Sequence, residues 1–151
     1  MDRKIKILSL NVGLSHNLAG LSTLVTANNV DLVMLQEVRM SQQQFDSHIE
    51  KIGFKGEVNI DLDFPCKPGT AVAWSKCLPV DHVFTTVLCR SQLVKIGKFV
   101  FMNIYAPSGS EKRQERSSFF AQELFTIFNM FPHSNYFLSG DYNCVLSPLD
   151  V

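Results

Sequence analysis

The first third of the chain alternates apolar runs with amphipathic segments. Residues 5–10 start in alternation and become continuously apolar, which predicts a strand with mostly buried surroundings. Apolar side chains then recur at helical spacing over residues 18–25, and a second buried strand is predicted over residues 31–37. Ser41 is the expected N-cap of a further helix, which Gly53 ends. The predicted order is therefore strand, helix, strand, helix.

The middle of the chain favours strands. Residues 64–69 form a loop by their Pro and Gly content. Successive strands with short connections are then predicted over residues 70–74, 80–88, 92–96 and 99–105.

The last part of the chain returns to a helix and one more strand. A polar stretch is followed by a helix with five large apolar side chains, which Pro132 ends. The apolar run over residues 136–138 predicts a short buried strand, which ends at Ser139-Gly140. Strands with helices before and after them predict an α/β domain of two or more layers. No repeat or linker interrupts the pattern, so residues 1–151 are expected to form one domain.

Polar side chains stand where four of these strands end. The residues are Asn11, Glu37, Tyr105, and Asp141 with Asn143. A carboxylate can accept a proton or hold a cation, and an amide can donate to an anionic oxygen. We expect the four ends to converge only if their strands share one edge of one sheet. The alternative is that each end is ordinary, since Gly-Asp and Asn are common turn residues.

Composition narrows the class of protein. The 151 residues are 46% hydrophobic, as in a globular domain. Their formal net charge is zero, so the composition does not predict a basic surface for a polyanionic partner. A small local basic patch would still serve such a partner. No apolar run approaches the ~20 residues that a membrane span needs, and no signal peptide is recognisable. We therefore expect an intracellular protein of the nucleus or cytoplasm, not secreted, with no membrane partner and no predicted protein partner.

Four blocks of the chain resemble, in the same order, blocks of the endonuclease/exonuclease/phosphatase superfamily. The resemblance is closest to the apurinic-type endonuclease domain of LINE-type (non-LTR) retrotransposons, in which Tyr-Ala-Pro precedes a charged stretch and a Phe-Phe helix. It extends from about Ile5 to Leu146. The four blocks are Leu10-Asn11-Val12, Leu35-Gln36-Glu37, Asn103-Ile104-Tyr105-Ala106-Pro107 and Ser139-Gly140-Asp141-Tyr142-Asn143.

The resemblance implies a four-layer α/β sandwich that cuts phosphate esters with Mg²⁺, or with Mn²⁺ in its place. In that family Glu37 matches a metal-ligand glutamate, and Asn11 matches an asparagine near the metal and the scissile phosphate. Tyr105 matches a tyrosine that hydrogen-bonds the phosphate. Asp141 matches the aspartate that orients or deprotonates the attacking water, and Asn143 matches an asparagine that stabilises the developing phosphorane. These roles agree with general chemistry. A hard cation binds carboxylate oxygen and needs few protein ligands, and preorganised hydrogen-bond donors stabilise charge that accumulates on phosphate oxygens.

The chain also departs from the family pattern. Val12 runs directly into Gly13, where the family often has a further acid or amide. The family continues past Gly-Asp-x-Asn to further strands and a C-terminal Ser-Asp-His block, and none of the four histidines here stands in such a motif. The expectation is therefore an N-terminal two-thirds of the domain that lacks the last strands, with an open sheet edge and weak or lost activity.

Three functional hypotheses follow. The favoured one is Mg²⁺-dependent hydrolysis of DNA phosphodiester bonds by a retrotransposon-type endonuclease. The second is phosphatase or nucleotidase activity on a small phosphate ester, which the zero net charge favours slightly. The third is a non-catalytic remnant that binds partners or does not fold.

A cluster of basic residues begins the late helix. Lys112, Arg113 and Arg116 either contact a nucleic-acid backbone or pair with Glu111 and Glu115 on a solvated helix end. Because these cations alternate with acidic residues, the solvated helix end with intrahelical ion pairs is the favoured interpretation.

Overall fold

The computed structural model describes residues 4–13, 18–64, 67–86 and 88–144. Its strands form two mixed four-stranded sheets, in the orders β1-β2-β4-β3 and β5-β6-β7-β8. Within the described residues no helix is both long and apolar enough to cross a membrane. The elements are β1 (Ile7–Asn11), α1 (Ala19–Asn28), β2 (Leu32–Val38), α2 (Gln42–Ile49), β3 (Phe54–Asn59), β4 (Gly69–Ser75), β5 (His82–Thr85), β6 (Ser91–Ile96), β7 (Phe99–Tyr105), α3 (Arg113–Ser118), α4 (Phe125–Met130) and β8 (Asn135–Asp141).

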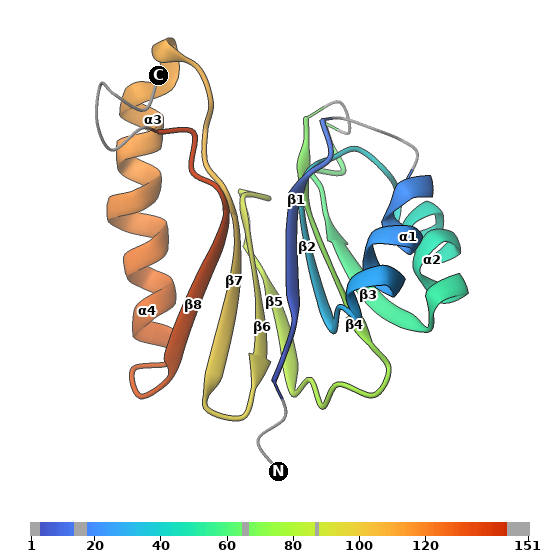
Figure 1. The fold of residues 1–151 in the computed structure, drawn as a ribbon. Helices are drawn as coiled ribbons and strands as arrows, with labels where there is room; N and C mark the ends of the chain where they lie inside the picture. The colour runs from blue at the N-terminus through green and yellow to red at the C-terminus, as the bar shows by residue number, and fades with distance from the viewer. Residues whose placement is uncertain (1–3, 14–17, 65–66, 87, 145–151) are drawn as a thin grey trace.

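The layers run helix, sheet, sheet, helix. Helices α1 and α2 cover the outer face of the first sheet, and the α3–α4 helix covers that of the second (Figure 1). A π-helical segment, Phe119–Leu124, joins α3 to α4. Apolar side chains fill three interfaces, one under each helical layer and one between the sheets. The expected four-layer α/β sandwich is confirmed.

Local sequence signals explain most of the elements. The Ser41 hydroxyl accepts from the Gln44 backbone N–H at 3.2 Å, and the Gln44 side chain accepts from the Ser41 N–H at 2.9 Å. This capping box satisfies two donors that a helix start otherwise leaves unbonded, so the predicted start of α2 is confirmed.

We expect Ser41→Ala to lower the free energy of unfolding by about 1 kcal/mol, because α2 loses its N-cap acceptor. Urea denaturation of wild type and variant measures the difference. Ser110→Ala is the matched control, because the short 3-10 helix Ser110–Lys112 has no side-chain hydrogen bond at its N-cap. Equal losses in both variants would contradict the capping role.

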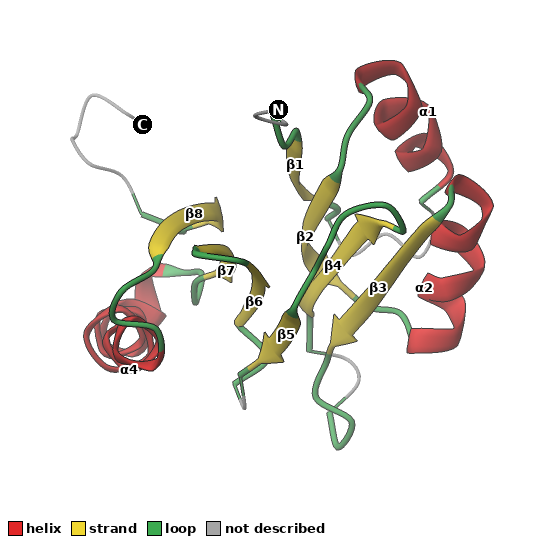
Figure 2. Ribbon diagram, turned by 90° about the horizontal axis from the view of Figure 1, so that it is seen from below, coloured by secondary structure: helices red, strands yellow, loops and turns green. Residues whose placement is uncertain are grey.

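Two strands that were predicted to be buried lie at sheet edges. Strand β1 pairs only with β2 and β8 only with β7, so each has one open edge within the described residues. Ile7 is 39% exposed, and Phe137 and Leu138 are 49% and 38% exposed. The prediction of burial was wrong because an apolar run shows hydrophobicity but not the number of neighbouring strands. Both open edges lie on the same side of the sandwich (Figure 2).

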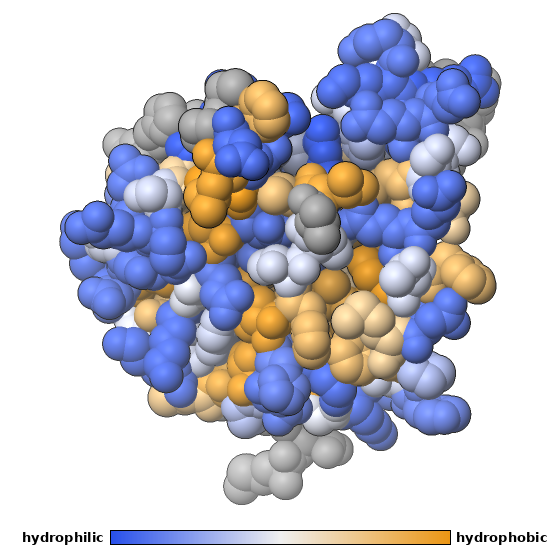
Figure 3. Space-filling model, turned by 180° about the vertical axis from the view of Figure 1, so that it is seen from behind, coloured by the Kyte–Doolittle hydropathy of each residue, from blue (hydrophilic) through white to orange (hydrophobic). Residues whose placement is uncertain are grey.

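The opposite side of the sandwich carries the edge strands β3 and β5. Apolar surface gathers in the middle of that face, with hydrophilic side chains on either flank (Figure 3). Strand β3 was not predicted, because its Lys, Gly, Glu and Asn interrupt the apolar pattern. Helix α2 supports it instead: the Gln42 side chain donates to the Gly56 carbonyl and accepts from the Val58 N–H. The predicted strand over residues 80–88 is shorter, His82–Thr85, and Val87 lies outside the described residues.

Candidate active site

Two parallel strand pairs bring the polar strand ends to one end of the sandwich. Asn11 lies opposite Gln36 in the β1–β2 pair, and Tyr105 lies opposite Asp141 in the β7–β8 pair. The four ends therefore converge, but from two sheets packed face to face. The expectation that convergence needs a single sheet edge was wrong, since the carboxyl ends of both pairs point the same way (Figure 1).

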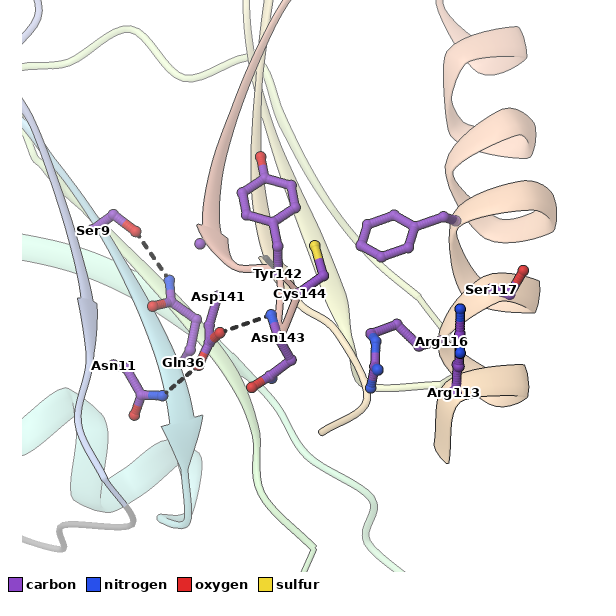
Figure 4. A pocket seen from close by; sticks show the side chains of 12 residues that line it. Ser9, Asn11, Gln36, Arg113, Arg116, Ser117, Asp141, Tyr142, Asn143 and Cys144 are labelled. Atoms are coloured by element: carbon purple, nitrogen blue, oxygen red, sulfur yellow. Dashed lines mark hydrogen bonds between the residues drawn. The ribbon is translucent and has the colours of Figure 1, made fainter. Parts of the chain in front are cut away.

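The Asn11 side chain connects carboxylates of the two sheets. Its amide nitrogen donates to Glu37 Oε1 at 3.0 Å and to Asp141 Oδ2 at 2.9 Å. The amide oxygen of Asn11 accepts from the Gly13 N–H at 2.9 Å, which fixes the orientation of the amide. One amide thus holds two like-charged groups together that come from positions 104 residues apart in sequence. Figure 4 shows Asn11 and Asp141 on one side of the pocket that they line.

A β-bulge directs Glu37 toward Asn11. In the β2–β4 ladder Gln36 pairs with Thr70 and Val38 with Gly69, so Glu37 is the extra residue. Its φ of 58° lies in the left-handed region, which costs a non-glycine residue about 1–3 kcal/mol. Bulges re-aim side chains beside functional sites, and strain of this kind is concentrated there.

An Asx turn fixes the Asp141 carboxylate. The Asn143 backbone N–H donates to Asp141 Oδ1 at 3.0 Å, and Asn143 has a φ of 47°. The Asn143 amide nitrogen donates to the Ala106 carbonyl at 2.7 Å, while the Ala106 N–H donates to the Asp141 carbonyl at 2.8 Å. The ordinary turn and the functional arrangement are therefore the same structure. The turn leaves one N–H of the Asn143 amide to donate elsewhere.

Tyr105 is only 4% exposed at the end of β7. Burial raises the pKa of its phenol, and the nearby negative charge of Glu37 raises it further. The Arg90 guanidinium, which stacks 4.8 Å from the ring centroid, opposes that rise. A raised pKa keeps the phenol protonated over a wider pH range, so Tyr105 remains a hydrogen-bond donor there.

Two buried amides that sequence reasoning did not single out couple the sheets beneath the site. Gln36 Nε2 donates to Asn103 Oδ1 at 2.7 Å, joining β2 to β7. Asn103 Nδ2 in turn donates to the carbonyls of Leu35 and Ala71. Polar residues inside otherwise apolar runs were the available signal, because such groups are buried only when they are hydrogen-bonded.

A pocket of about 1060 Å³ opens beside the carboxylates. Asn11, Asp141 and Asn143 line one side, and Arg113 and Arg116 extend from the helix across from them (Figure 4). Arg116 Nη1 donates to the carbonyls of Pro107 and Gly109, which fastens the loop that follows Tyr105. The predicted intrahelical ion pairs are not found: the ion pair among the described residues joins Lys67 to Asp61.

The donor set suits a hard cation. The described residues contain no cluster of three or more His, Cys, Asp or Glu that could hold a metal. Mg²⁺ needs only one or two carboxylates and keeps its remaining waters, so the Glu37 carboxylate alone meets that requirement. Asn11 presents its amide nitrogen to both carboxylates, so its role as a metal ligand stays a prediction.

No described histidine lies at the pocket. His48 belongs to α2, His82 begins β5, and His133 lies between α4 and β8. His16 lies outside the described residues.

Comparisons with known proteins support this architecture. No protein-family model and no curated protein matches the chain. Among solved structures, an AP endonuclease from Archaeoglobus fulgidus matches with a TM-score of 0.74 and 20% identity, over 98% of this chain and 61% of its own. The 3′ phosphatase NExo from Neisseria, bound to a product DNA hairpin, matches with a TM-score of 0.74 and 22% identity, over 97% and 61%.

A humanized D. rerio TDP2 matches with a TM-score of 0.71 and 19% identity, over 94% of this chain and 63% of its own. The AP endonuclease and TDP2 belong to the endonuclease/exonuclease/phosphatase superfamily. This chain has that superfamily's fold. It spans 61–63% of the length of these three solved structures.

Proposed function

We propose that the chain carries a Mg²⁺-dependent site that hydrolyses phosphodiester bonds of DNA. One observation carries the proposal: the Asn11 amide joins the Glu37 and Asp141 carboxylates at the end of the sandwich where the pocket opens. A carboxylate pair held by a neutral donor beside an open pocket provides both a cation ligand and a proton acceptor. The Asx turn and the bulge hold these groups in place before substrate arrives.

Each residue of the site has a role that follows from the chemistry of its side chain. Glu37 holds Mg²⁺, which would neutralise charge that develops on the phosphate oxygens. Asp141 takes a proton of the attacking water on a carboxylate oxygen while the water oxygen bonds to phosphorus. The P–O bond to the leaving oxygen breaks, and that oxygen takes a proton from solvent. Tyr105 and the remaining N–H of the Asn143 amide donate to phosphate oxygens, and Asn11 sets the distance between the two carboxylates.

DNA is the favoured substrate for two reasons. NExo is bound to a product DNA hairpin, and a D. rerio TDP2 with 19% identity is complexed with a single-strand DNA product. In addition, the Tyr-Ala-Pro block followed by a charged stretch and Phe119-Phe120 resembles the retrotransposon endonucleases. We therefore infer an endonuclease of the LINE-type group.

A second candidate is hydrolysis of a phosphate monoester. NExo is a 3′ phosphatase, and the chain carries no net positive charge that would favour a polymer over a small ester. The same carboxylates would serve both reactions, so the substrate must be tested directly.

Nicking of supercoiled plasmid by the full chain tests the proposal. We expect nicking in Mg²⁺ or Mn²⁺ and none in EDTA. Asn11→Ala should reduce the rate by about 10- to 100-fold, because the carboxylates lose the donor that orients both of them. Asn129→Ala, an exposed asparagine of α4, is the matched control and should nick at the wild-type rate.

The outcomes separate the three hypotheses. Nicking that resists EDTA, or that Asn11→Ala and Asn129→Ala affect equally, would refute the proposed site. Metal-dependent turnover of p-nitrophenyl phosphate without nicking would select the phosphatase. Absence of both activities would leave the non-catalytic remnant, which is folded if the thermal transition is cooperative and unfolded if no such transition is seen with or without Mg²⁺.

A further inference from the structure

The pocket is larger than one phosphate group needs. Its volume of about 1060 Å³ lies just above the ~300–1,000 Å³ typical of sites for a single small molecule. Its lining also differs from one side to the other. Asn11 and the Asp141 carboxylate come from the sheets, whereas Arg113, Arg116 and Phe120 come from the α3–α4 helix.

Arg113 is the positively charged residue of α3 whose side chain has no hydrogen-bond or ion-pair partner in the described structure. Arg116, one turn later, is committed to the carbonyls of Pro107 and Gly109. Arg113 forms no hydrogen bond or ion pair there, although Glu111 and Glu115 are close in sequence. Its guanidinium lines the pocket that also contains Asp141, so its charge is available to a ligand that carries an anion (Figure 4).

An aromatic pair lines the same pocket. The rings of Phe120 and Tyr142 are nearly parallel, at 10°, with centroids 6.2 Å apart. Both residues are half-buried, so each offers part of its ring surface to the pocket. Such rings bind nucleobases by stacking with little regard for base identity.

We propose that this pocket binds two or more consecutive nucleotides of a DNA strand. The reacting phosphodiester lies at Asn11 and Asp141, the neighbouring phosphate binds the Arg113 guanidinium, and a base contacts the Phe120–Tyr142 pair. The inference rests on the proposed function and names its substrate as a strand, not a small phosphate ester. A DNA strand carries one phosphate at every nucleotide. The phosphate next to the reacting one can therefore bind the Arg113 guanidinium.

Binding without metal tests this inference separately from hydrolysis. The probe is a fluorescein-labelled thymidine octamer, measured by fluorescence anisotropy with the full chain in EDTA. We expect Arg113→Gln to weaken binding about tenfold and to lower the slope of log affinity against log salt by about 0.7, the value for one phosphate contact on a single strand. Tyr142→Leu should weaken binding about tenfold at an unchanged slope, because stacking carries no charge.

Lys98→Gln is the matched control, since it removes one positive charge in the β6–β7 turn, outside the pocket. It should leave affinity within about twofold and the slope unchanged. Thymidine monophosphate as competitor should bind at least tenfold more weakly than the octamer. Circular dichroism spectra that match wild type confirm that each variant is folded.

Three results would overturn the inference. They are equal effects of Arg113→Gln and Lys98→Gln, equal affinity for the monophosphate and the octamer, or no octamer binding by a folded chain. Octamer binding with the expected Arg113 effect but without metal-dependent nicking would refute the proposed hydrolysis and keep the strand-binding pocket.

Discussion

Asp141→Ala is expected to reduce metal-dependent plasmid nicking by about 10²- to 10⁴-fold. The change removes the carboxylate that we propose as the proton acceptor, and a positioned general base contributes about that factor. It also removes the acceptor of the Asn11 and Asn143 hydrogen bonds, so both amides lose their orientation. The measurement is the initial rate of conversion of supercoiled to open circular plasmid.

Asp141→Asn separates the two effects. It keeps a side chain of the same shape and can keep one acceptor for Asn11, but it cannot take a proton. We expect it to nick as slowly as Asp141→Ala while unfolding at nearly the wild-type denaturant concentration. Glu50→Ala removes an exposed carboxylate far from the pocket and controls for charge. Nicking by Asp141→Asn at more than a tenth of the wild-type rate would exclude Asp141 as the base.

Gly140→Ala is expected to destabilise the chain by about 3 kcal/mol or more. A Cβ at this position would lie 1.9 Å from the Ile104 carbonyl oxygen, which is backbone of the neighbouring strand and has little room to move. Gly140 also has a φ of 139°, which side chains of L-residues rarely adopt. Strand β8 would have to separate from β7 just before Asp141. Urea denaturation followed by circular dichroism measures the loss.

Gly20→Ala is the control of opposite sign. Gly20 lies within α1, and a Cβ there would meet no atom within 4 Å. Alanine in a helix is favoured over glycine by about 0.5–1 kcal/mol, so this variant should be more stable than wild type. If Gly140→Ala unfolded at the same denaturant concentration as wild type, the close approach of β8 to Ile104 would be refuted.

The sequence pattern predicted most elements but not their neighbours. Periodicity and capping signals located α1, α2 and the β6–β7 hairpin, because those signals are local. Strand β3 was not predicted because it is held by pairing with β4 and by hydrogen bonds to the Gln42 side chain, which its own polar residues do not indicate. The edge positions of β1 and β8 were missed since burial depends on which strands pair.

The candidate site shows the same difference between local features, which the sequence predicts, and contacts between distant strands, which it does not. The five candidate residues could be found from the sequence, because each stands at a strand end inside a block with a family resemblance. The bulge at Glu37 and the Gln36–Asn103 bond could not, since both arise from contact between strands that are distant in sequence. Convergence from two sheets likewise follows from sheet packing and not from any motif.

The Asn11 contacts have a consequence for how folding and ligation depend on each other. Glu37 belongs to one sheet and Asp141 to the other, so the two carboxylates meet only while the sheets are docked. The site at which Glu37 would hold Mg²⁺ beside Asp141 is therefore assembled only in the docked state. A cation that binds the assembled site and not the separated sheets stabilises the docked state by mass action, more strongly as its concentration rises above its dissociation constant. Folding and Mg²⁺ binding would then be coupled, so that Mg²⁺ raises the free energy of unfolding and a loosened sheet interface lowers the affinity for Mg²⁺.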